Sequence, residues 1–386
     1  MYVYADNAAT TQVHPAALEA MVTCLRDVNG NPSSLHTPGQ KAKEALETAR
    51  CTVADCLGAR PQEIYFTGGG SEADNQAILT AAQQGAKQGK KHIVTSAFEH
   101  HAVLHTLKKL EKQGYEVTYL DVHSDGIVQP EDVAAALRPD TCLVTIMLVN
   151  NEIGTIQPVE EIAALCRERK ILCHTDAVQA VGHIPIDVKE LGVDMLSLSG
   201  HKFHAPKGTG ALYIRNGVHL QRFIQGGAQE KTQRAGTENM ASIVGMGKAI
   251  EIATEQIDSH VEYLTKLRDH MIHRLTTEIP YTRLNGHATQ RLPGNVNVSI
   301  EYIEGESLLL SLDLKGVAAS SGSACTSGSL DPSHVLLAIG LPHEIAHGSL
   351  RFSLSEDNTM EEVDYVVDEL KPIVEKLRAM SPLYNK

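Results

Sequence analysis

The chain has 386 residues, which predicts one large and one smaller domain rather than one simple core. Its hydrophobic content of 42% with 21% charged residues excludes an intrinsically disordered protein, and its net charge of −13 disfavours a general nucleic-acid-binding surface. The start, MYVYADNAATT, resembles no secretory signal, and no apolar run is long enough to span a bilayer. We therefore expect a cytoplasmic protein without membrane contact.

The first two-thirds of the chain alternate short apolar runs, rich in β-branched residues, with amphipathic helical patterns. Strands are predicted at 62–67, 92–97, 115–120, 142–149, 171–175 and 194–199. Helices are predicted between them, for example at 71–88, 101–113 and 158–170. This alternation predicts α/β layers around a mostly parallel sheet. The segment 208–214 follows the last of these strands too closely for a crossover, so we expect an antiparallel strand there.

After about residue 237 the pattern changes. Long helical patterns cover 237–278, and shorter strands are predicted at 295–300, 317–320 and 349–354, before a final helix from 359. We expect a large domain of residues 15–257 and a small domain of residues 1–14 and 258–386. Ligands of open α/β sheets bind at the carboxyl ends of the strands, and most of the polar residues below follow a predicted strand.

The turn Gly68-Gly69-Gly70-Ser71 lies between a predicted strand and a predicted helix. Glycines let the backbone approach an anion, and a helix N-terminus presents N–H groups to it. Ser71 can cap the helix or donate to a phosphate oxygen. No GK[ST] follows, so the motif is not a P-loop, and plain turn chemistry is the more common explanation for it alone.

Two further motifs follow predicted strands. In HTDAVQAVG (174–182), Asp176 is either a helix cap or a carboxylate that keeps a pyridinium nitrogen protonated, and Gln179 lies on the same helical side. In LSLSGHKFHAPKGTG (196–210), Lys202 stands beside hydroxyl and imidazole donors suited to a phosphate. Nearby cations lower the pKa of an amine, which a Schiff-base lysine requires. The spacing places Asp176 and Lys202 at the carboxyl edge of neighbouring strands.

His100 and His101 follow the predicted strand 92–97. Adjacent residues at a helix start point in different directions, so we expect at most one of them to face a site. Either is explained equally by a capping or surface role. His100 is also able to stack on a flat ring and to exchange protons near neutral pH.

The seven cysteines lack paired spacings such as CxxC, so we expect no metal site and six reduced, mostly structural thiols. Cys325 is the exception, because it lies in a glycine-punctuated run predicted to be an exposed loop, the setting that a moving catalytic thiol needs. Arg351 lies on a predicted apolar strand, where it requires either a structural carboxylate or the carboxylate of a substrate.

Together and in this order, the motifs resemble those of the cysteine desulfurases of the NifS-like group, which use pyridoxal phosphate (PLP). The resemblance covers essentially the whole chain. It is carried by DNAATT (6–11), GNPSSLH (30–36), GGGSEADN (68–75), EHHAV (99–103), VNNEIG (149–154), HTDAVQAVG, SGHKFHAPKGTG (199–210), RAGTEN (234–239), SSGSACTSG (320–328) and RFSLS (351–355). It implies the PLP-dependent transferase fold type I, with a large domain whose mixed, mostly parallel sheet is flanked by helices and a smaller α/β domain.

The resemblance also implies how the cofactor is held. Lys202 would form the Schiff base with PLP and later move protons. Asp176 would pair with the pyridine nitrogen, Gln179 would bond the ring oxygen and His100, a catalytic residue, would stack on the ring. Asn151 would contact the cofactor as well.

The phosphate and the substrate have their own implied residues. The cofactor phosphate would be bound by Gly70, Ser71, Ser199 and His201, with Thr237 reaching in from the second subunit of a homodimer. The carboxylate of L-cysteine would be fixed by Asn151 and Arg351. Cys325 would attack the substrate sulfur, take it up as a persulfide and leave L-alanine as the product.

The small-residue stretch around Cys325 resembles the long-loop class, which passes sulfur to an iron–sulfur scaffold or another acceptor protein. The chain ends at SPLYNK, before the extended tail with which housekeeping members contact such a scaffold, so the acceptor stays open. A selenocysteine lyase or an aminotransferase of the same fold is the alternative, and neither would need Cys325. An idle scaffold of this fold would have lost Lys202 or Cys325, and both are present.

Overall fold

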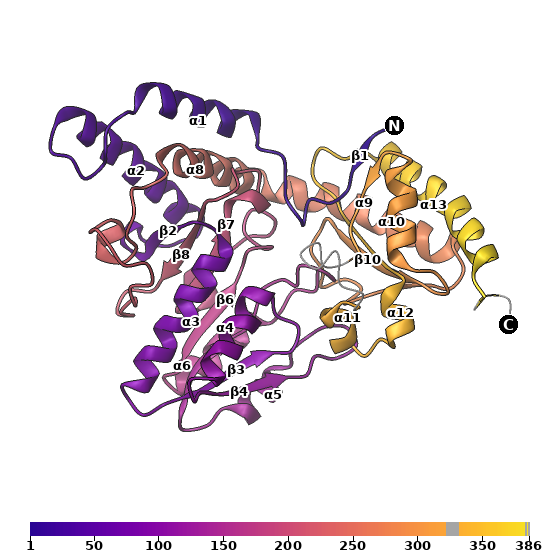
Figure 1. Cartoon of the computed structure of the whole chain (residues 1–386), viewed down its shortest axis with the longest axis horizontal. Helices are drawn as coiled ribbons and strands as arrows, with labels where there is room; N and C mark the ends of the chain where they lie inside the picture. The colour runs from indigo at the N-terminus through magenta and orange to yellow at the C-terminus, as the bar shows by residue number, and fades with distance from the viewer. Residues whose placement is uncertain (322–331, 383, 385–386) are drawn as a thin grey trace.

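The computed structural model describes residues 1–321, 332–382 and 384, which form two lobes (Figure 1). The N-terminal two-thirds of the chain form the larger lobe around one sheet. The C-terminal third forms the smaller lobe, and the first residues of the chain run back to it (Figure 1). None of the helices in these residues has the length and apolar character needed to cross a membrane.

The larger lobe is built on a seven-stranded sheet in the order β2-β8-β7-β6-β5-β3-β4. Its strands are β2 (Ile64–Thr67), β3 (His92–Ser96), β4 (Glu116–Leu120), β5 (Thr141–Thr145), β6 (Leu172–Asp176), β7 (Met195–Ser199) and β8 (Gly210–Ile214). All neighbours from β7 to β4 are parallel, whereas β8 is antiparallel to both β7 and β2. The short connection from β7 to β8 therefore joins two antiparallel strands, as the sequence predicted.

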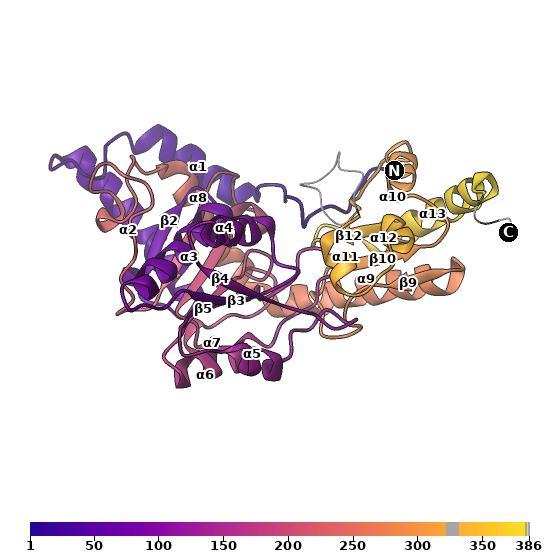
Figure 2. The same ribbon diagram turned by 60° about the horizontal axis from the view of Figure 1, so that its bottom comes forward.

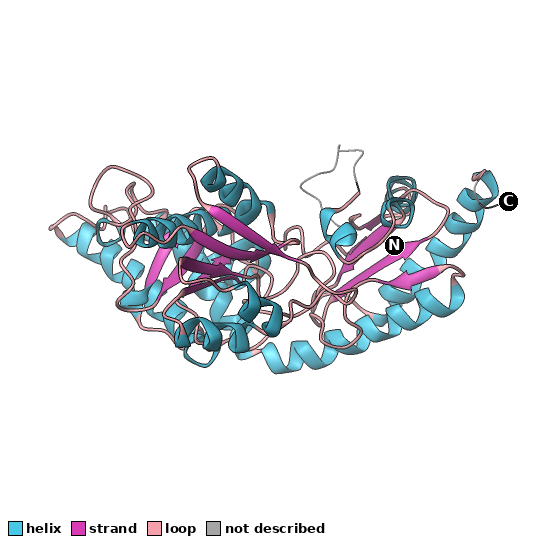
Figure 3. Ribbon diagram, turned by 90° about the horizontal axis from the view of Figure 1, so that it is seen from below, coloured by secondary structure: helices cyan, strands magenta, loops and turns pink. Residues whose placement is uncertain are grey.

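Helices cover both faces of this sheet (Figure 3). They are α1 (Pro15–Asp27), α2 (Thr37–Cys56), α3 (Gly70–Ala86), α4 (His101–Glu111), α5 (Pro130–Ala136), α6 (Val159–Glu168), α7 (Val188–Leu191) and α8 (Met240–Glu255). Strands β3, β5, β7 and β8 are buried at every residue. A sheet covered on both faces needs apolar side chains on both, which explains continuous apolar runs in place of alternation.

The smaller lobe contains an antiparallel three-stranded sheet in the order β12-β10-β9 (Figure 2). Its strands and helices are α9 (Ile257–Glu278), β9 (Thr282–Leu284), β10 (Asn295–Ile300), α10 (Gly305–Asp313), α11 (His334–Ala338), α12 (His343–His347), β12 (Ser349–Ser353) and α13 (Met360–Met380). The N-terminal strand β1 (Val3–Tyr4) pairs in parallel with β11 (Val317–Ala318). The first residues thus belong to the same buried cluster as α9, α10 and α13.

One predicted strand, 142–149, is longer than the observed β5, which ends at Thr145. The reason is the backbone N–H of Met147, which donates to both carboxylate oxygens of Glu99 at 3.0 and 3.1 Å. A side chain from the loop after β3 thereby replaces a neighbouring strand as the hydrogen-bond partner. Sequence periodicity alone does not reveal this, because residues 146–149 are as apolar and as buried as the strand itself.

Candidate active site

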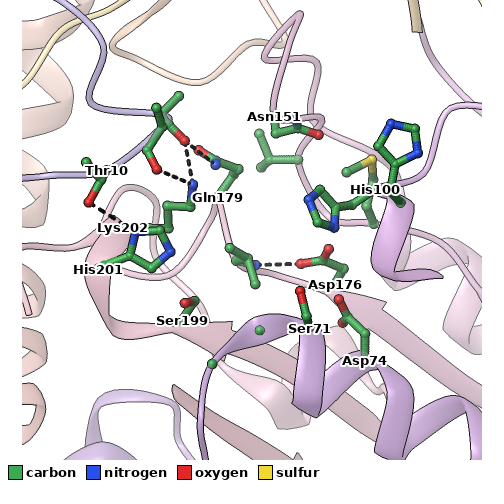
Figure 4. Close-up of a pocket in the computed structure, with 18 of the residues that line it drawn as sticks. Thr10, Ser71, Asp74, His100, Asn151, Asp176, Gln179, Ser199, His201 and Lys202 are labelled. Carbon is green, nitrogen blue, oxygen red and sulfur yellow. Dashed lines mark hydrogen bonds between the residues drawn. The ribbon is translucent and has the colours of Figure 1, made fainter. Parts of the chain in front are cut away.

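A cavity of about 560 Å³ lies at the carboxyl ends of the large-sheet strands, between them and residues of the N-terminal segment and β12 (Figure 4). Of the predicted site residues that the structure describes, all except Thr237 line it. They are Gly70, Ser71, His100, Asn151, Asp176, Gln179, Ser199, His201, Lys202 and Arg351. The strand topology therefore brings motifs that are far apart in the sequence to one cavity.

Asp176 is the last residue of β6 and lies deep in the cavity, with only 4% of its surface exposed. One of its carboxylate oxygens accepts the backbone N–H of Val178 at 2.9 Å. Burial raises the pKa of Asp176 to about 6, although the Val178 N–H and the nearby Lys202 both act to lower it. The carboxylate is thus largely ionised at neutral pH and suits a protonated aromatic nitrogen.

Lys202 lies in a short 3₁₀ turn that begins directly after β7. Its Nζ donates to the carbonyl oxygens of Ala8 and Ala9 at 2.6 and 2.9 Å (Figure 4). The side-chain amide of Gln179 donates to the Ala8 carbonyl as well, at 3.0 Å. The N-terminal segment therefore forms one wall of the site and holds both side chains, although it belongs to the far end of the sequence.

One end of the cavity is formed by the N-terminus of α3, which begins at Gly70. A Cβ atom at Gly70 would lie 2.5 Å from a Val178 methyl group, so only glycine permits this close approach. The first turn of a helix leaves backbone N–H groups without intrahelical partners. With the hydroxyls of Ser71 and Ser199 nearby, these groups form a set of donors suited to a phosphate.

His201 completes this end of the cavity, with Nδ1 3.2 Å from the hydroxyl of Thr10. Its pKa is lowered to about 4, mainly by burial and then by Lys202 and Lys207. The imidazole is therefore neutral at physiological pH. It can contribute a hydrogen bond to an anion but not a positive charge.

His100 is the N-cap of α4, where its Nδ1 accepts the backbone N–H of Ala102 at 3.1 Å. Burial, followed by the charge of Lys202, lowers the pKa of His100 to about 4. A neutral imidazole fits stacking on a flat ring better than the proton exchange near neutral pH that the sequence suggested. His101 lines the cavity too, so the expectation that at most one of the pair would face it was wrong. His100, the cap residue, has an extended backbone (φ −61°, ψ 148°). The rotation of about 100° between successive helical residues, on which the expectation rested, therefore does not apply between His100 and His101.

Arg351 lies on β12 with 2% of its surface exposed. Its Nη1 donates to the Asn151 carbonyl at 2.9 Å, and its Nη2 lies 3.1 Å from a carboxylate oxygen of Asp6. Its Nε is buried and has no hydrogen-bond partner among the described residues. Of the two alternatives that the sequence left open, the structure provides a structural carboxylate, Asp6, and the guanidinium also lines the cavity.

Cys325 lies outside the described residues, but the residues that flank its segment reach the cavity. Ser320 pairs through two backbone hydrogen bonds with Arg351, at 3.1 and 2.6 Å. On the other side, the hydroxyl of Ser333 donates to the carboxylate of Glu152, and His334 lines the cavity. The segment that carries Cys325 therefore starts and ends beside the site.

These residues fit pyridoxal phosphate. An amine, a deep carboxylate and a phosphate cradle surround one cavity, and no large apolar side chain fills the space near Gly69, where a Cβ atom would meet only the Ser199 hydroxyl, at 3.8 Å. The sequence profile of the aminotransferase class-V family matches residues 3–366.

The chain belongs to the aminotransferase class-V family.

Within this family the chain is similar to proteins named cysteine desulfurase. It is 57% identical over 384 residues to cysteine desulfurase IscS of Methanosarcina thermophila, covering 100% of this chain and 95% of the relative. It is 53% identical to IscS of Clostridium botulinum (strain Hall), covering 99% and 97%. A solved structure of a NifS-like protein superposes with a TM-score of 0.92 at 40% identity, covering 98% of this chain and all of that one. A structure of SspA in complex with cysteine has a TM-score of 0.82 at 38% identity, covering 92% and 100%.

This class-V chain is therefore a PLP-dependent enzyme of the cysteine desulfurase group, as the sequence predicted. The fold type I prediction is confirmed as well. Thr237 is exposed and does not line the cavity of its own chain. The six described cysteines are free thiols, and four of them are buried, namely Cys24, Cys142, Cys166 and Cys173.

Sequence reasoning gave no role to four acidic residues at the site. Glu72, Asp74 and Glu152 line the cavity, and Asp6 pairs with Arg351 from the first motif of the chain. Each lies inside a motif that carries the family resemblance, and Asp74 follows Ser71 by three residues, which places both on the same side of α3. Helical spacing was thus a usable signal for Asp74.

Proposed function

We propose that this cysteine desulfurase takes sulfur from L-cysteine in the cavity described above and holds it as a persulfide on Cys325. The observation that carries the proposal is the convergence of Lys202, Asp176 and the N-terminus of α3 on one cavity. Among the described residues on either side of the segment that carries Cys325, Ser320 pairs with Arg351, and both Arg351 and His334 line the same cavity. This arrangement provides cofactor binding and access for a thiol together.

Pyridoxal phosphate, when bound, supplies an electron sink for the bonds at the substrate's α-carbon. In our proposal Lys202 attaches the cofactor, and its amine later carries protons to and from the substrate. Asp176 holds the ring nitrogen protonated, Gln179 donates to the ring oxygen, and the neutral imidazole of His100 lies against the ring. Each of these side chains is held by contacts with the protein itself.

The phosphate and the substrate carboxylate are bound at two separate places. Gly70, Ser71, Ser199 and His201 supply donors for the phosphate. Arg351 lines the cavity and has N–H groups that neither Asp6 nor the Asn151 carbonyl uses, which we assign to the carboxylate of L-cysteine, and Asn151 lines the same cavity. Charge-assisted hydrogen bonds of this kind are the strong ones, so we assign substrate orientation to Arg351.

The sulfur step joins Cys325 and the bound substrate, and it depends on the electron sink that pyridoxal phosphate would supply. The Cys325 thiolate forms a bond to the substrate sulfur while the bond between that sulfur and the β-carbon breaks. The electron pair of the broken bond stays with the carbon, which becomes the methyl group of L-alanine after protonation. The enzyme then carries the persulfide for transfer to an acceptor.

We also propose a homodimer in which Thr237 reaches the partner's phosphate site. Two features of the larger lobe support this. Thr237 is exposed in its own chain, and α1 presents an exposed apolar stripe of Leu18, Val22 and Leu25, whose spacing places them on one helix face.

We also propose that the large domain comprises residues 15–257 and the small domain residues 1–14 and 258–386. We propose a cytoplasmic location, and an iron–sulfur scaffold or another acceptor protein as the recipient of the sulfur.

The test is the Cys325→Ser enzyme, with Cys51→Ser as the matched control, since Cys51 is a free and exposed thiol. We expect Cys325→Ser to form neither persulfide nor sulfide, whereas cysteine still changes the cofactor's visible absorbance. Cys51→Ser should behave as the wild type. Sulfide and alanine release at the wild-type rate from Cys325→Ser would instead indicate a lyase reaction that needs no protein thiol, and conversion of cysteine to a 2-oxo acid would indicate an aminotransferase.

A further inference from the structure

Asp74 is a buried acid at the cavity that the reaction described above does not use. It lies in the second turn of α3, only 1% of its surface is exposed, and it lines the cavity beside Ser71 (Figure 4). The favourable effect of a helix N-terminus on negative charge is largely confined to the first turn. The helix therefore does little to stabilise an ionised carboxylate at this position.

Among the described residues, no group with a positive charge lies within hydrogen-bonding distance of Asp74. An oxygen of Asp74, an oxygen of Asp176 and a ring nitrogen of His100 all lie within 4.8 Å of one another. The Nε2 of His174 is 3.7 Å from Asp74, but this ring is held between the hydroxyls of Ser197 and Thr145, at 2.9 and 2.8 Å. Burial lowers the pKa of His174 to about 3, so the ring is neutral.

The facing titratable groups reinforce this pattern. Asp176 and His174 face Asp74 from β6, Glu99 and His100 face it from the start of α4, and Lys202 lies farther across the cavity after β7. Burial raises the pKa of Glu99 to about 8, so Glu99 adds an acid and no cation. One oxygen of Asp74 has no hydrogen-bond partner among the described residues.

Two buried carboxylates at this separation cannot both be ionised at low cost, so one of them keeps a proton. Asp176 receives the Val178 N–H and the charge of Lys202, both of which favour its ionised form. For Asp74, burial and the charge of Asp176 raise the pKa, and a hydrogen bond from Ser197 acts to lower it. The result is a pKa well above the ordinary value. The proton therefore belongs on Asp74.

We propose that Asp74 is a positioning residue that stays protonated, so that the negative charge of the pair resides on Asp176. A neutral acid beside Asp176 is able to donate to it, directly or through one water molecule, and does not compete with it for a cation. Asp74 thus acts on the cofactor's ring nitrogen through Asp176. This inference rests on the proposed function for its effect on the cofactor, but the protonation of Asp74 itself does not.

The first test measures the proton directly, by infrared difference spectroscopy of the purified enzyme labelled with ¹³C-carboxyl aspartate at neutral pH. We expect a protonated-carboxyl band that shifts with the label and is absent from Asp74→Asn. Glu99 also retains a proton, but its band does not move with the aspartate label. No shifted band in the wild type, or one that persists in Asp74→Asn, would overturn the proposal. A band that appears only after treatment with EDTA would overturn it in favour of a bound metal ion.

The second test follows the cofactor, by the pH titration of its visible absorbance and by its retention during dialysis. Asp74→Asn keeps a neutral donor, so the titration midpoint should stay within about 0.3 pH unit of the wild type and the cofactor retention within about two-fold. Asp74→Leu has a similar size without a donor, and we expect about ten-fold weaker retention, as for a lost hydrogen bond to a charged group. A downward shift of the titration midpoint by about one unit or more in Asp74→Asn would show that Asp74 is ionised in the wild type. If Asp74→Leu does not fold, the infrared result and Asp74→Asn still decide.

Discussion

Replacing Arg351 separates substrate binding from stability, because its guanidinium has internal partners in Asp6 and the Asn151 carbonyl and still lines the cavity. Its guanidinium pairs with Asp6 at 3.1 Å, where the two side chains are 2% and 18% exposed. Its Nε is buried without a partner among the described residues. Arg351→Ala should therefore have two effects that arise from different atoms.

The loss of stability comes from Asp6, which is left without its cation. Removing one partner of a buried ion pair costs about 3–5 kcal/mol, and the partial exposure of Asp6 reduces this to about 2–3 kcal/mol. The loss of substrate binding comes from a charge-assisted hydrogen bond to the cysteine carboxylate, worth about 1.5–3 kcal/mol. This corresponds to a rise in KM of about ten- to hundred-fold.

Denaturant unfolding and steady-state kinetics on four enzymes distinguish the two effects. They are the wild type, Arg351→Ala, Asp6→Asn and the double variant. The double variant should recover about 1–2 kcal/mol of stability relative to Arg351→Ala, because no charge is left unpaired. Its KM should stay as high as that of Arg351→Ala.

Arg351→Lys is the matched control, since it keeps the charge but loses the planar fork, and its KM should be intermediate. A KM within two-fold of the wild type in Arg351→Ala would refute the assignment of the substrate carboxylate to this residue. So would a double variant that restores KM together with stability.

Two further predictions concern the attachment of the cofactor and the dependence of stability on pH. After borohydride reduction, mass spectrometry of the wild type should show the added mass of the cofactor, which should be absent from Lys202→Ala; the added mass on another lysine of that variant would contradict the placement. Burial raises the pKa of Glu99 from 4.5 to about 8, so the folded protein keeps a proton that the unfolded chain releases. The contribution of Glu99 to the free energy of unfolding is fully present below pH 4.5. It falls by about 1.4 kcal/mol per pH unit between pH 4.5 and about pH 8, and is lost above that. The free energy of unfolding of Glu99→Gln, measured with denaturant, should lack this fall between about pH 5 and pH 8. If the wild type and Glu99→Gln instead show the same dependence on pH, Glu99 is ionised in the folded protein.

Much of the fold followed from local pattern. The alternation of strands and helices in the large lobe and the antiparallel strand β8 were predicted, because apolar periodicity and connection length depend on neighbouring residues. Most of the residues proposed to hold the cofactor line one cavity for a related reason. They lie in short motifs near the ends of strands, and parallel strands bring their carboxyl ends to one edge.

Only the tertiary structure decided which distant groups share a proton or a charge. The sequence placed an arginine on an apolar strand, but its partner Asp6 lies 345 residues away. Asp74 and Asp176 come together because α3 packs across the end of β6, and Glu99 ended a predicted strand by taking the N–H of Met147. Local periodicity carries no record of such pairings, since they depend on how separate elements pack and on the low dielectric of the interior that this packing creates.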